Sequence, residues 1–213
     1  MPLPRHLVIF ARRPQLGTGK RRLAKDIGPV QALRFQRVLL AHTLRRLGRD
    51  RRWTTWLAVT PDRSGGPWAM RLRLLNQGSG DLGRRMATVM RKLPPGPVAI
   101  VGADIPGLMP HHVTSAFGQL GRRDAVFGPA SDGGYWLVGL RRRPRILDPF
   151  REIRWSTEHA LADTLRNLAR SEVALLDTLA DVDDGPSLSR NPGWEVLCCR
   201  QGRGPRSQPL DWS

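Results

Sequence analysis

Apolar and polar positions form two kinds of pattern that follow one another along the chain. Short apolar runs, typical of buried strands, alternate with longer stretches in which apolar residues recur every three or four positions, as in amphipathic helices. The pattern predicts strands over residues 7–10, 54–59, 71–75, 98–101, 125–127, 135–140 and 173–176. It predicts helices over residues 29–47, 110–120 and 157–169, with a further helix that Asp81 caps and Pro94 ends. This alternation indicates an α/β domain.

The length of 213 residues fits one domain, which we place at residues 1–188. Residues 189–213 are rich in Gly, Pro and Arg and are predicted to form a C-terminal tail. No apolar run is long enough to span a membrane, and the run from Leu7 to Ala11 is too short for the core of a signal peptide. The two cysteines, Cys198 and Cys199, are adjacent and form no disulfide framework, so we expect a cytoplasmic protein.

The chain is strongly positive, with 35 basic against 18 acidic residues and a net charge of +17. Only three of the basic residues are lysines, and the arginines are spread through the whole sequence. A dedicated nucleic-acid-binding protein usually gathers such charge on one face or arm. We therefore expect a solvated arginine surface with a weak, salt-sensitive attraction to polyanions, and no specific nucleic-acid binding.

Four polar segments follow predicted strands, at residues 13–22, 77–83, 102–106 and 128–135. In an open, mostly parallel sheet, ligands bind beyond the carboxyl ends of the strands. The four segments are therefore expected to converge on one ligand site.

The first polar segment contains Gly17, Lys20 and Arg22. It is not a P-loop, because Pro14 and Arg21 stand where that motif requires glycine and Ser or Thr. Backbone amides and two cationic side chains can still surround a phosphate chain. The alternative interpretation is a basic surface turn.

Asp104 follows the buried strand predicted at residues 98–101. Mg²⁺ typically takes one or two protein carboxylates, water and phosphate oxygens, so Asp104 is a candidate ligand; the alternative is a cap of the next helix. Asp181, Asp183 and Asp184 form an acidic cluster in a basic chain, and Asp183 is our candidate for the second ligand. Most of that cluster is equally compatible with a solvated turn.

The segment Asp132-Gly133-Gly134-Tyr135 combines a carboxylate, two glycines and the only tyrosine of the chain. The glycines allow close approach of a ligand to the backbone, and Asp132 could bind a hydroxyl group or act as a base. A β-hairpin turn that begins with Asp explains the same residues equally well.

These segments together resemble one known family. The matching motifs are Phe10-Ala11-Arg12-Arg13-Pro14 with Gly17, Lys20, Arg22 and Leu23; Gln77-Gly78-x-Gly80-Asp81-Leu82-Gly83 with Met86; Gly102-x-Asp104-x-Pro106; Gly128-Pro129-x-x-Asp132-Gly133-Gly134-Tyr135-x-Leu137-x-Gly139; Trp155-Ser156-Thr157; and Asp181-x-Asp183. Over residues 6–188 the chain resembles domain-of-unknown-function family 2064, whose members are described as A-type glycosyltransferase-like proteins. The resemblance implies a nucleotide-diphospho-sugar transferase (GT-A) fold, a Rossmann-like three-layer α/β/α domain with a mostly parallel mixed sheet.

The resemblance also implies roles for single residues. They are nucleotide binding by Phe10, Ala11, Gly17, Lys20, Arg22, Gln77, Gly80 and Asp81, metal binding by Asp104, and acceptor binding near Asp132, Gly133, Gly134 and Tyr135. Arg21 stands where the family usually has Thr or Ser, which adds charge beside the phosphates. The ending Asp184-Gly185-Pro186 departs from the usual pattern, which leaves the second metal ligand open.

These observations favour a Mg²⁺- or Mn²⁺-dependent transferase with a nucleotide or nucleotide-sugar donor and a small-molecule acceptor. In a glycosyltransferase-like reaction, an acceptor hydroxyl beside Asp132 attacks the anomeric carbon, and Lys20 neutralises charge on the leaving oxygens. In a nucleotidyltransferase, the phosphate of a small metabolite attacks the α-phosphorus of an NTP and releases pyrophosphate. The third hypothesis is a non-catalytic basic protein that binds a nucleotide or nucleic acid.

Overall fold

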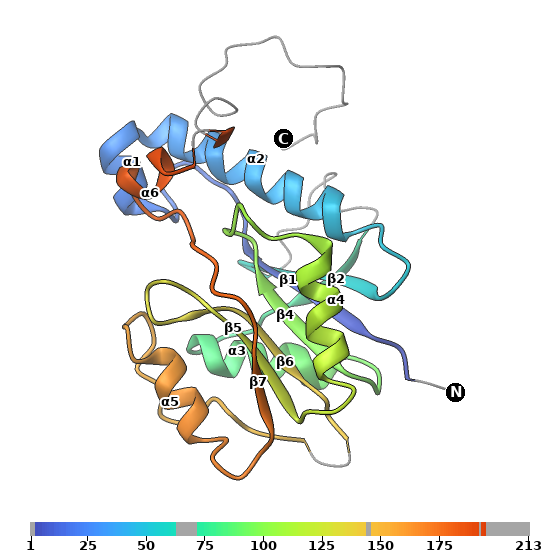
Figure 1. The fold of residues 1–213 in the computed structure, drawn as a ribbon. Coiled ribbons are helices and arrows are strands. Elements are labelled where there is room, and N and C mark those ends of the chain that lie inside the picture. Colours follow the sequence, from blue (N-terminus) through green and yellow to red (C-terminus); the bar gives the residue numbers. More distant parts are fainter. Residues whose placement is uncertain (1–2, 63–71, 144–145, 192, 195–213) are drawn as a thin grey trace.

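The computed structural model describes residues 3–62, 72–143, 146–191 and 193–194. Residue 71 of the third predicted strand and nearly all of the predicted tail, including both cysteines, lie outside the described residues. The described chain forms one sheet with helices on both faces (Figure 1).

The sheet contains seven strands in the order β3-β2-β1-β4-β6-β5-β7. Their bounds are β1 His6–Arg12, β2 Thr54–Thr60, β3 Arg73–Asn76, β4 Val98–Gly102, β5 Ala125–Pro129, β6 Tyr135–Leu140 and β7 Val173–Leu175. Strand β6 is antiparallel to both its neighbours, β4 and β5, and the other described strand pairs are parallel. The expected mostly parallel mixed sheet is thus confirmed.

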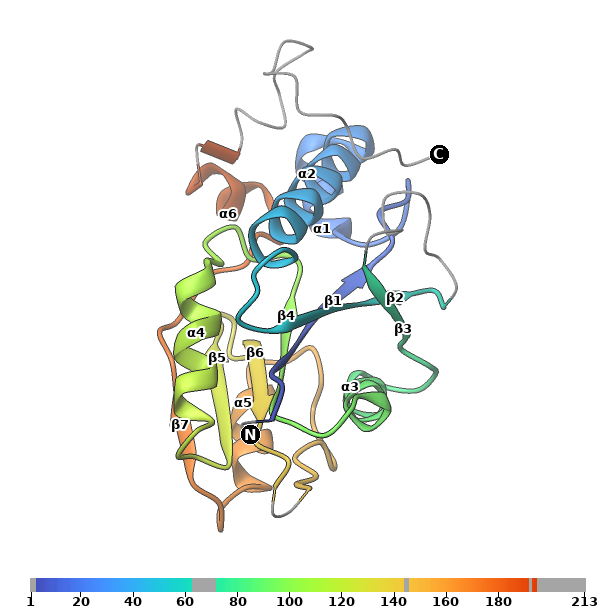
Figure 2. The same ribbon diagram turned by 90° about the vertical axis from the view of Figure 1, so that its right-hand side faces the viewer.

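The described part of the chain has six helices: α1 Arg21–Ile27, α2 Pro29–Leu47, α3 Leu82–Lys92, α4 Pro110–Gln119, α5 Ala160–Arg166 and α6 Gly185–Ser189. Side chains alternate between the two faces of a strand, so Leu7 and Ile9 of β1 pack with α2 and α4, whereas Val8 packs on the side of α3 and α5. Figure 2 shows α2 and α4 on one side of the sheet and α3 on the other. This arrangement is the expected three-layer α/β/α domain.

A smaller apolar cluster joins α1 and α2 to α6, which is distant from them in the sequence. Leu23 of α1, Phe35 of α2 and Leu188 of α6 are buried together, and the Gly185 N–H donates to Asp26 Oδ2 at 2.7 Å. This packing holds the segment before α6 close to the loop of residues 13–20, called the first loop below, which connects β1 to α1.

Most of the predicted elements are present, with two kinds of difference. The helix predicted at residues 29–47 has those bounds, and Asp81 caps α3 by accepting a hydrogen bond from the Arg84 N–H at 2.8 Å. The helix predicted at 157–169 is shorter, since α5 spans Ala160–Arg166, and the side chain of the following Asn167 donates to the carbonyls of Pro149 and Arg151. Helices α1 and α6 were not predicted, since each is short and gains its burial from distant residues.

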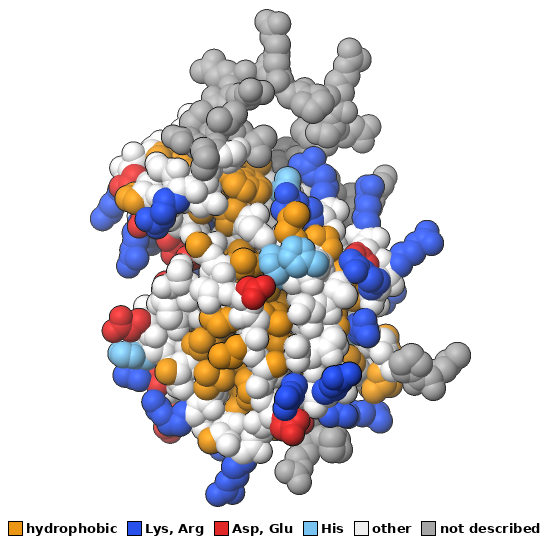
Figure 3. Space-filling view, viewed as in Figure 1, with side chains coloured by type: hydrophobic (Ala, Val, Ile, Leu, Met, Phe, Trp, Pro, Cys, Tyr) orange, Lys and Arg blue, Asp and Glu red, His pale blue; other side chains and the backbone are white. Residues whose placement is uncertain are grey.

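The basic side chains are dispersed over the surface. On the face shown in Figure 3, Lys and Arg side chains lie scattered around the molecule with Asp and Glu among them. Among the residues described, no helix combines the length and apolar character needed to cross a membrane.

Phe127 supports the strand that leads to the 128–135 segment. Its ring is fully buried between the sheet and α5 and lies 5.2 Å from the Tyr135 ring. We expect Phe127→Ala to lower the free energy of unfolding by about 3–5 kcal/mol, because it removes buried area and leaves a cavity. Urea denaturation would measure the loss, and Phe127→Leu should lose clearly less; equal losses would contradict a cavity effect.

Candidate metal and nucleotide site

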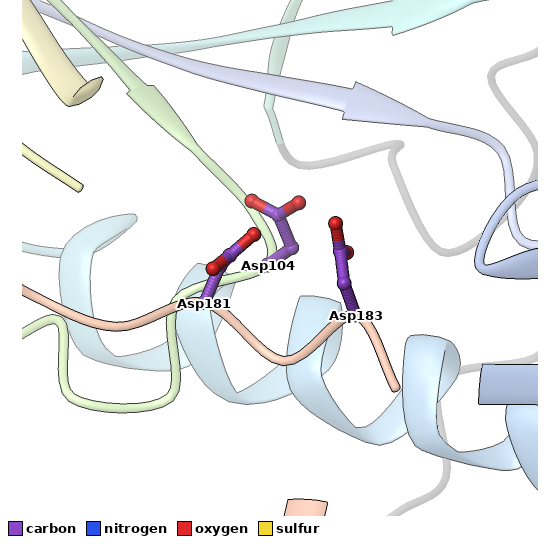
Figure 4. Close-up of side chains that lie close together, drawn as sticks. All are labelled: Asp104, Asp181 and Asp183. Atoms are coloured by element: carbon purple, nitrogen blue, oxygen red, sulfur yellow. The ribbon is translucent and has the colours of Figure 1, made fainter. Parts of the chain in front are cut away.

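Three carboxylates and one lysine meet beyond the carboxyl ends of β1 and β4. Lys20 ends the loop after β1, Asp104 follows β4, and Asp181 and Asp183 lie on the segment between β7 and α6. Figure 4 shows the three aspartate side chains gathered at one point. One oxygen of each carboxylate lies within 4.8 Å of an oxygen of each of the others.

Lys20 bridges two of the three carboxylates. Its Nζ donates to Asp104 Oδ2 at 3.2 Å and to Asp183 Oδ1 at 2.5 Å. The Lys20 side chain is only 10% exposed, whereas those of Asp104 and Asp183 are 47% and 49% exposed. Burial lowers the pKa of Lys20, but the charges of Asp104 and Asp183 outweigh it, and the net pKa is raised. The ammonium therefore stays charged and holds the two acids together.

Asp181 lies in a less solvated position beside the other two acids. Burial, followed by the negative charges of Asp183 and Asp104, raises its pKa from 3.8 to about 6. Three close carboxylates with room for water form the oxygen-rich donor set that Mg²⁺ and Mn²⁺ prefer. The residues thus fit the divalent cation that the family resemblance implies, and Asp104, Asp181 and Asp183 would hold it.

The conformation of the first loop explains the position of Lys20. Gly17 and Gly19 have φ values of 76° and 71°, a region that favours glycine, and Lys20 itself has φ 39° and ψ 44° at the start of α1. A non-glycine residue is strained there, and its ion pairs with Asp104 and Asp183 stabilise the arrangement. The buried, ion-paired Lys20 therefore does not fit the alternative interpretation of this loop, a basic surface turn.

A first hollow of about 260 Å³ lies between the first loop and α2. Of the predicted nucleotide-binding residues, Phe10, Ala11 and Lys20 line it. Arg12 and Gln36 line it too, and neither was predicted from the sequence. Arg22 is exposed on α1 and is not among the lining residues.

A second hollow of about 380 Å³ lies on the other side of Asp104 and Asp183, which line both. Of the four residues predicted for acceptor binding, Asp132, Gly134 and Tyr135 line it and Gly133 does not; Trp155 lines it as well. The Trp155-Ser156-Thr157 motif, to which the family resemblance gives no role, lines this hollow with all three residues.

Residues 130–134 are also the turn of the β5–β6 hairpin, so the alternative interpretation of that segment holds as well. Asp132 Oδ1 accepts a hydrogen bond from the Gly134 N–H at 2.9 Å. Gly133 has φ 83°, and a Cβ at this position would collide with the backbone of Glu158. The turn therefore requires glycine and holds Asp132 at the rim of the second hollow.

Three further residues predicted to bind the nucleotide, Gln77, Gly80 and Asp81, line neither of these two hollows. Gln77 is fully buried, and its Nε2 donates to the carbonyls of Ala11 at 3.0 Å and Ala58 at 2.7 Å while Arg85 donates to its Oε1. Its side chain thus joins the ends of β1 and β2. Asp81 caps α3, and none of Gln77, Gly80 and Asp81 is among the residues that line the two hollows.

The alternative role of an aspartate at this edge of the sheet is to cap the helix that follows it. Asp104 does not cap the next helix, since the N-cap of α4 is Met109. Asp184, in contrast, caps α6 by accepting a hydrogen bond from the Ser187 N–H at 2.8 Å. The sequence does not single out Asp181 within the acidic cluster, because its position beside Asp104 depends on the fold of distant residues.

Solved structures of other proteins share this fold. A protein assigned as a nucleotide-diphospho-sugar transferase from Desulfovibrio desulfuricans G20 is 26% identical, with a TM-score of 0.79 over 91% of this chain and 96% of that one. CMP:2-keto-3-deoxy-manno-octonic acid synthetase in complex with CTP is 13% identical, with a TM-score of 0.59 over 91% and 99% of the two chains. The 4-diphosphocytidyl-2C-methyl-D-erythritol synthase of Anaerococcus prevotii DSM 20548 is 11% identical, with a TM-score of 0.56 over 90% and 96%.

No curated protein matches the sequence. The model of a family described as uncharacterized proteins conserved in bacteria, DUF2064, matches residues 43–157. This range contains Asp104 and the 128–135 segment but neither Lys20 nor the Asp181–Asp183 segment. Because the match covers more than half of the chain and the fold agrees, the protein belongs to the DUF2064 family and has a nucleotide-diphospho-sugar transferase fold.

Proposed function

We propose that the protein is a metal-dependent transferase that uses a nucleotide-sugar donor and transfers the glycosyl group to a small acceptor. The observation that carries this proposal is the position of Lys20, Asp104, Asp181 and Asp183 between two hollows of different chemistry. The fold shared with a nucleotide-diphospho-sugar transferase-like protein and with a synthetase in complex with CTP supports a nucleotide donor.

Each group has a defined task in this reaction. Asp104, Asp181 and Asp183 would hold a divalent cation, which supplies charge neutralisation on the donor diphosphate when it is bound. Lys20 would donate to the same phosphate oxygens and stabilise the charge that develops on them. Arg12 adds a second cationic side chain to the first hollow, where we place the donor.

Asp132 would accept the proton of the acceptor hydroxyl in the second hollow. The hydroxyl oxygen then forms a bond to the anomeric carbon, the bond from that carbon to the diphosphate breaks, and its electron pair stays on the phosphate oxygen. Tyr135 does not take this role, since burial raises the pKa of its phenol above the usual range and the phenol stays protonated.

The test is thermal denaturation of the purified protein with a panel of nucleotides and nucleotide-sugars, with and without Mg²⁺ or Mn²⁺. A ligand that binds only the native state raises the melting temperature by mass action. We expect a metal-dependent shift for one base, followed by release of nucleoside diphosphate when an acceptor is supplied. Release of pyrophosphate would favour nucleotidyl transfer instead, and strong salt-sensitive RNA or DNA binding without any donor shift would overturn the proposal.

The affinity for Mn²⁺ is expected to depend on the protonation of Asp181. Its pKa of about 6 means that the carboxyl is mostly protonated at pH 5 and ionised at pH 7, and only the ionised form binds a cation. The affinity for Mn²⁺ should therefore rise about tenfold from pH 5 to pH 7, in a single step centred near the pKa of Asp181. Calorimetric Mn²⁺ titrations at several pH values would measure this change in affinity, and Asp181→Asn should remove the pH dependence. A Mn²⁺ affinity of the native protein that is constant from pH 5 to pH 7 would contradict the prediction.

A further inference from the structure

The charge of the second hollow limits what can bind there. In a chain with 35 basic residues, none of the described residues that line this hollow is Lys, Arg or His. Four carboxylates line it instead, those of Asp104, Asp132, Asp181 and Asp183. We infer that the acceptor carries hydroxyl groups and no phosphate or carboxylate, so that it is uncharged or positively charged. This inference rests on the proposed function and narrows its acceptor.

The two hollows differ in the charge of their linings, so the first favours an anionic ligand and the second a neutral or cationic one. The first hollow has Arg12 and Lys20 in its lining, and proteins bind phosphate with such side chains. In the second hollow a divalent cation would leave the carboxylate set with net negative charge, and Asp132 would face the acceptor unpaired. A phosphate placed there would meet repulsion and lose its hydration without a charged donor.

Three basic side chains close to the second hollow are engaged by other groups. Arg154 precedes Trp155, but its Nε and Nη2 each donate to the buried Asp163 at 2.8 Å. Arg85 donates to Gln77 and lies over the Phe10 ring with its guanidinium carbon 5.6 Å from the centroid. Lys20 is held by Asp104 and Asp183 at the border of the two hollows. None of these cations points to an acceptor phosphate.

Aromatic side chains contribute to the apolar lining of the second hollow. Phe10, Tyr135 and Trp155 line it, and the rings of Tyr135 and Trp155 lie 6.4 Å apart at an interplanar angle of 68°. Such rings pack against the C–H faces of sugars and polyols and attract amines through their negative faces. Ser156 and Thr157 add hydroxyl groups to the same lining. This combination matches a sugar, a polyol or an amino alcohol.

Matched pairs of small probes test the inference. The pairs are glycerol and glycerol 3-phosphate, ethanolamine and O-phosphoethanolamine, and glucosamine and glucosamine 6-phosphate. Saturation-transfer NMR on the full chain with Mg²⁺, with and without the donor nucleotide, would measure their binding. We expect each unphosphorylated probe to bind at least about tenfold more tightly than its phosphorylated partner.

Charge variants tie the result to this hollow. Asp132→Lys should reverse the order of each pair, whereas Asp177→Lys, a change at an exposed carboxylate that does not line the hollow, should preserve it. Asp132→Asn keeps an oxygen that can accept from the Gly134 N–H and should weaken the amine probes more than glycerol.

Equal or tighter binding of the phosphorylated probes would overturn the inference. So would the absence of binding by all unphosphorylated probes in a protein that still binds its nucleotide with Mg²⁺. Failure of the proposed function is a separate result, because it appears as the loss of any metal-dependent nucleotide shift.

Discussion

Asp104→Asn is expected to abolish the metal-dependent shift with nucleotide and to lower turnover by at least about a hundredfold, because the amide keeps the shape but loses the charge that a divalent cation requires. Asp104 is also one of the two partners of Lys20, so the variant loosens the lysine as well. Turnover and melting temperature would be measured with saturating Mg²⁺ and the donor found in the panel.

The matched control is Asp177→Asn, which makes the same change at an exposed carboxylate that lines neither hollow. It should keep turnover within about twofold, since surface changes rarely act at a distance. An Asp104→Asn protein with normal metal-dependent binding would show that the cation is held elsewhere.

Lys20→Gln should have two effects of opposite sign. In the absence of nucleotide, Mn²⁺ should bind about tenfold more tightly, because the ammonium that now neutralises Asp104 and Asp183 at close range is removed. Turnover should fall by about a hundredfold, since the charge beside the leaving phosphate is lost. Electron paramagnetic resonance would count free Mn²⁺ in a titration, and steady-state kinetics would give turnover.

Lys25→Gln is the control for Lys20→Gln, because Lys25 is exposed on α1 and outside both hollows. It should change neither quantity. Weaker Mn²⁺ binding by Lys20→Gln would be incompatible with competition between the lysine and the cation.

Much of the fold could be predicted because its signals are local. The run Val98–Val101 is apolar throughout, and the 29–47 segment repeats its apolar residues at helical spacing between Gly28 and Gly48. The meeting of Lys20 with Asp104 also follows from the pattern, since each lies in a segment that follows a predicted strand, and the carboxyl ends of parallel strands share one edge. The pattern does not fix the position of Asp183, because a solvated turn explains its acidic cluster equally well.

Other parts of the site depend on partners that are distant in the sequence. Gln77 stands in a Gly-rich stretch that looks exposed, but its bonds go to carbonyls 66 and 19 residues away. Burial of Asp181 is set by the same kind of distant packing. Arg142 belongs to the arginines expected on a solvated surface, yet its guanidinium donates to the carbonyls of Leu93, Pro94 and Gly96.

The ion pair between Lys20 and Asp183 joins residues 163 positions apart, and this sets an order of events during synthesis. Chains fold from the N-terminus as they leave the ribosome. The strands β1 to β6 can pair before residue 181 has been made, but the carboxylate cluster cannot exist until Asp183 has emerged. At that stage a nascent chain can carry a nearly complete sheet without the carboxylate cluster, and the proposed metal and nucleotide site is complete only after the segment that leads into α6 has docked on α1.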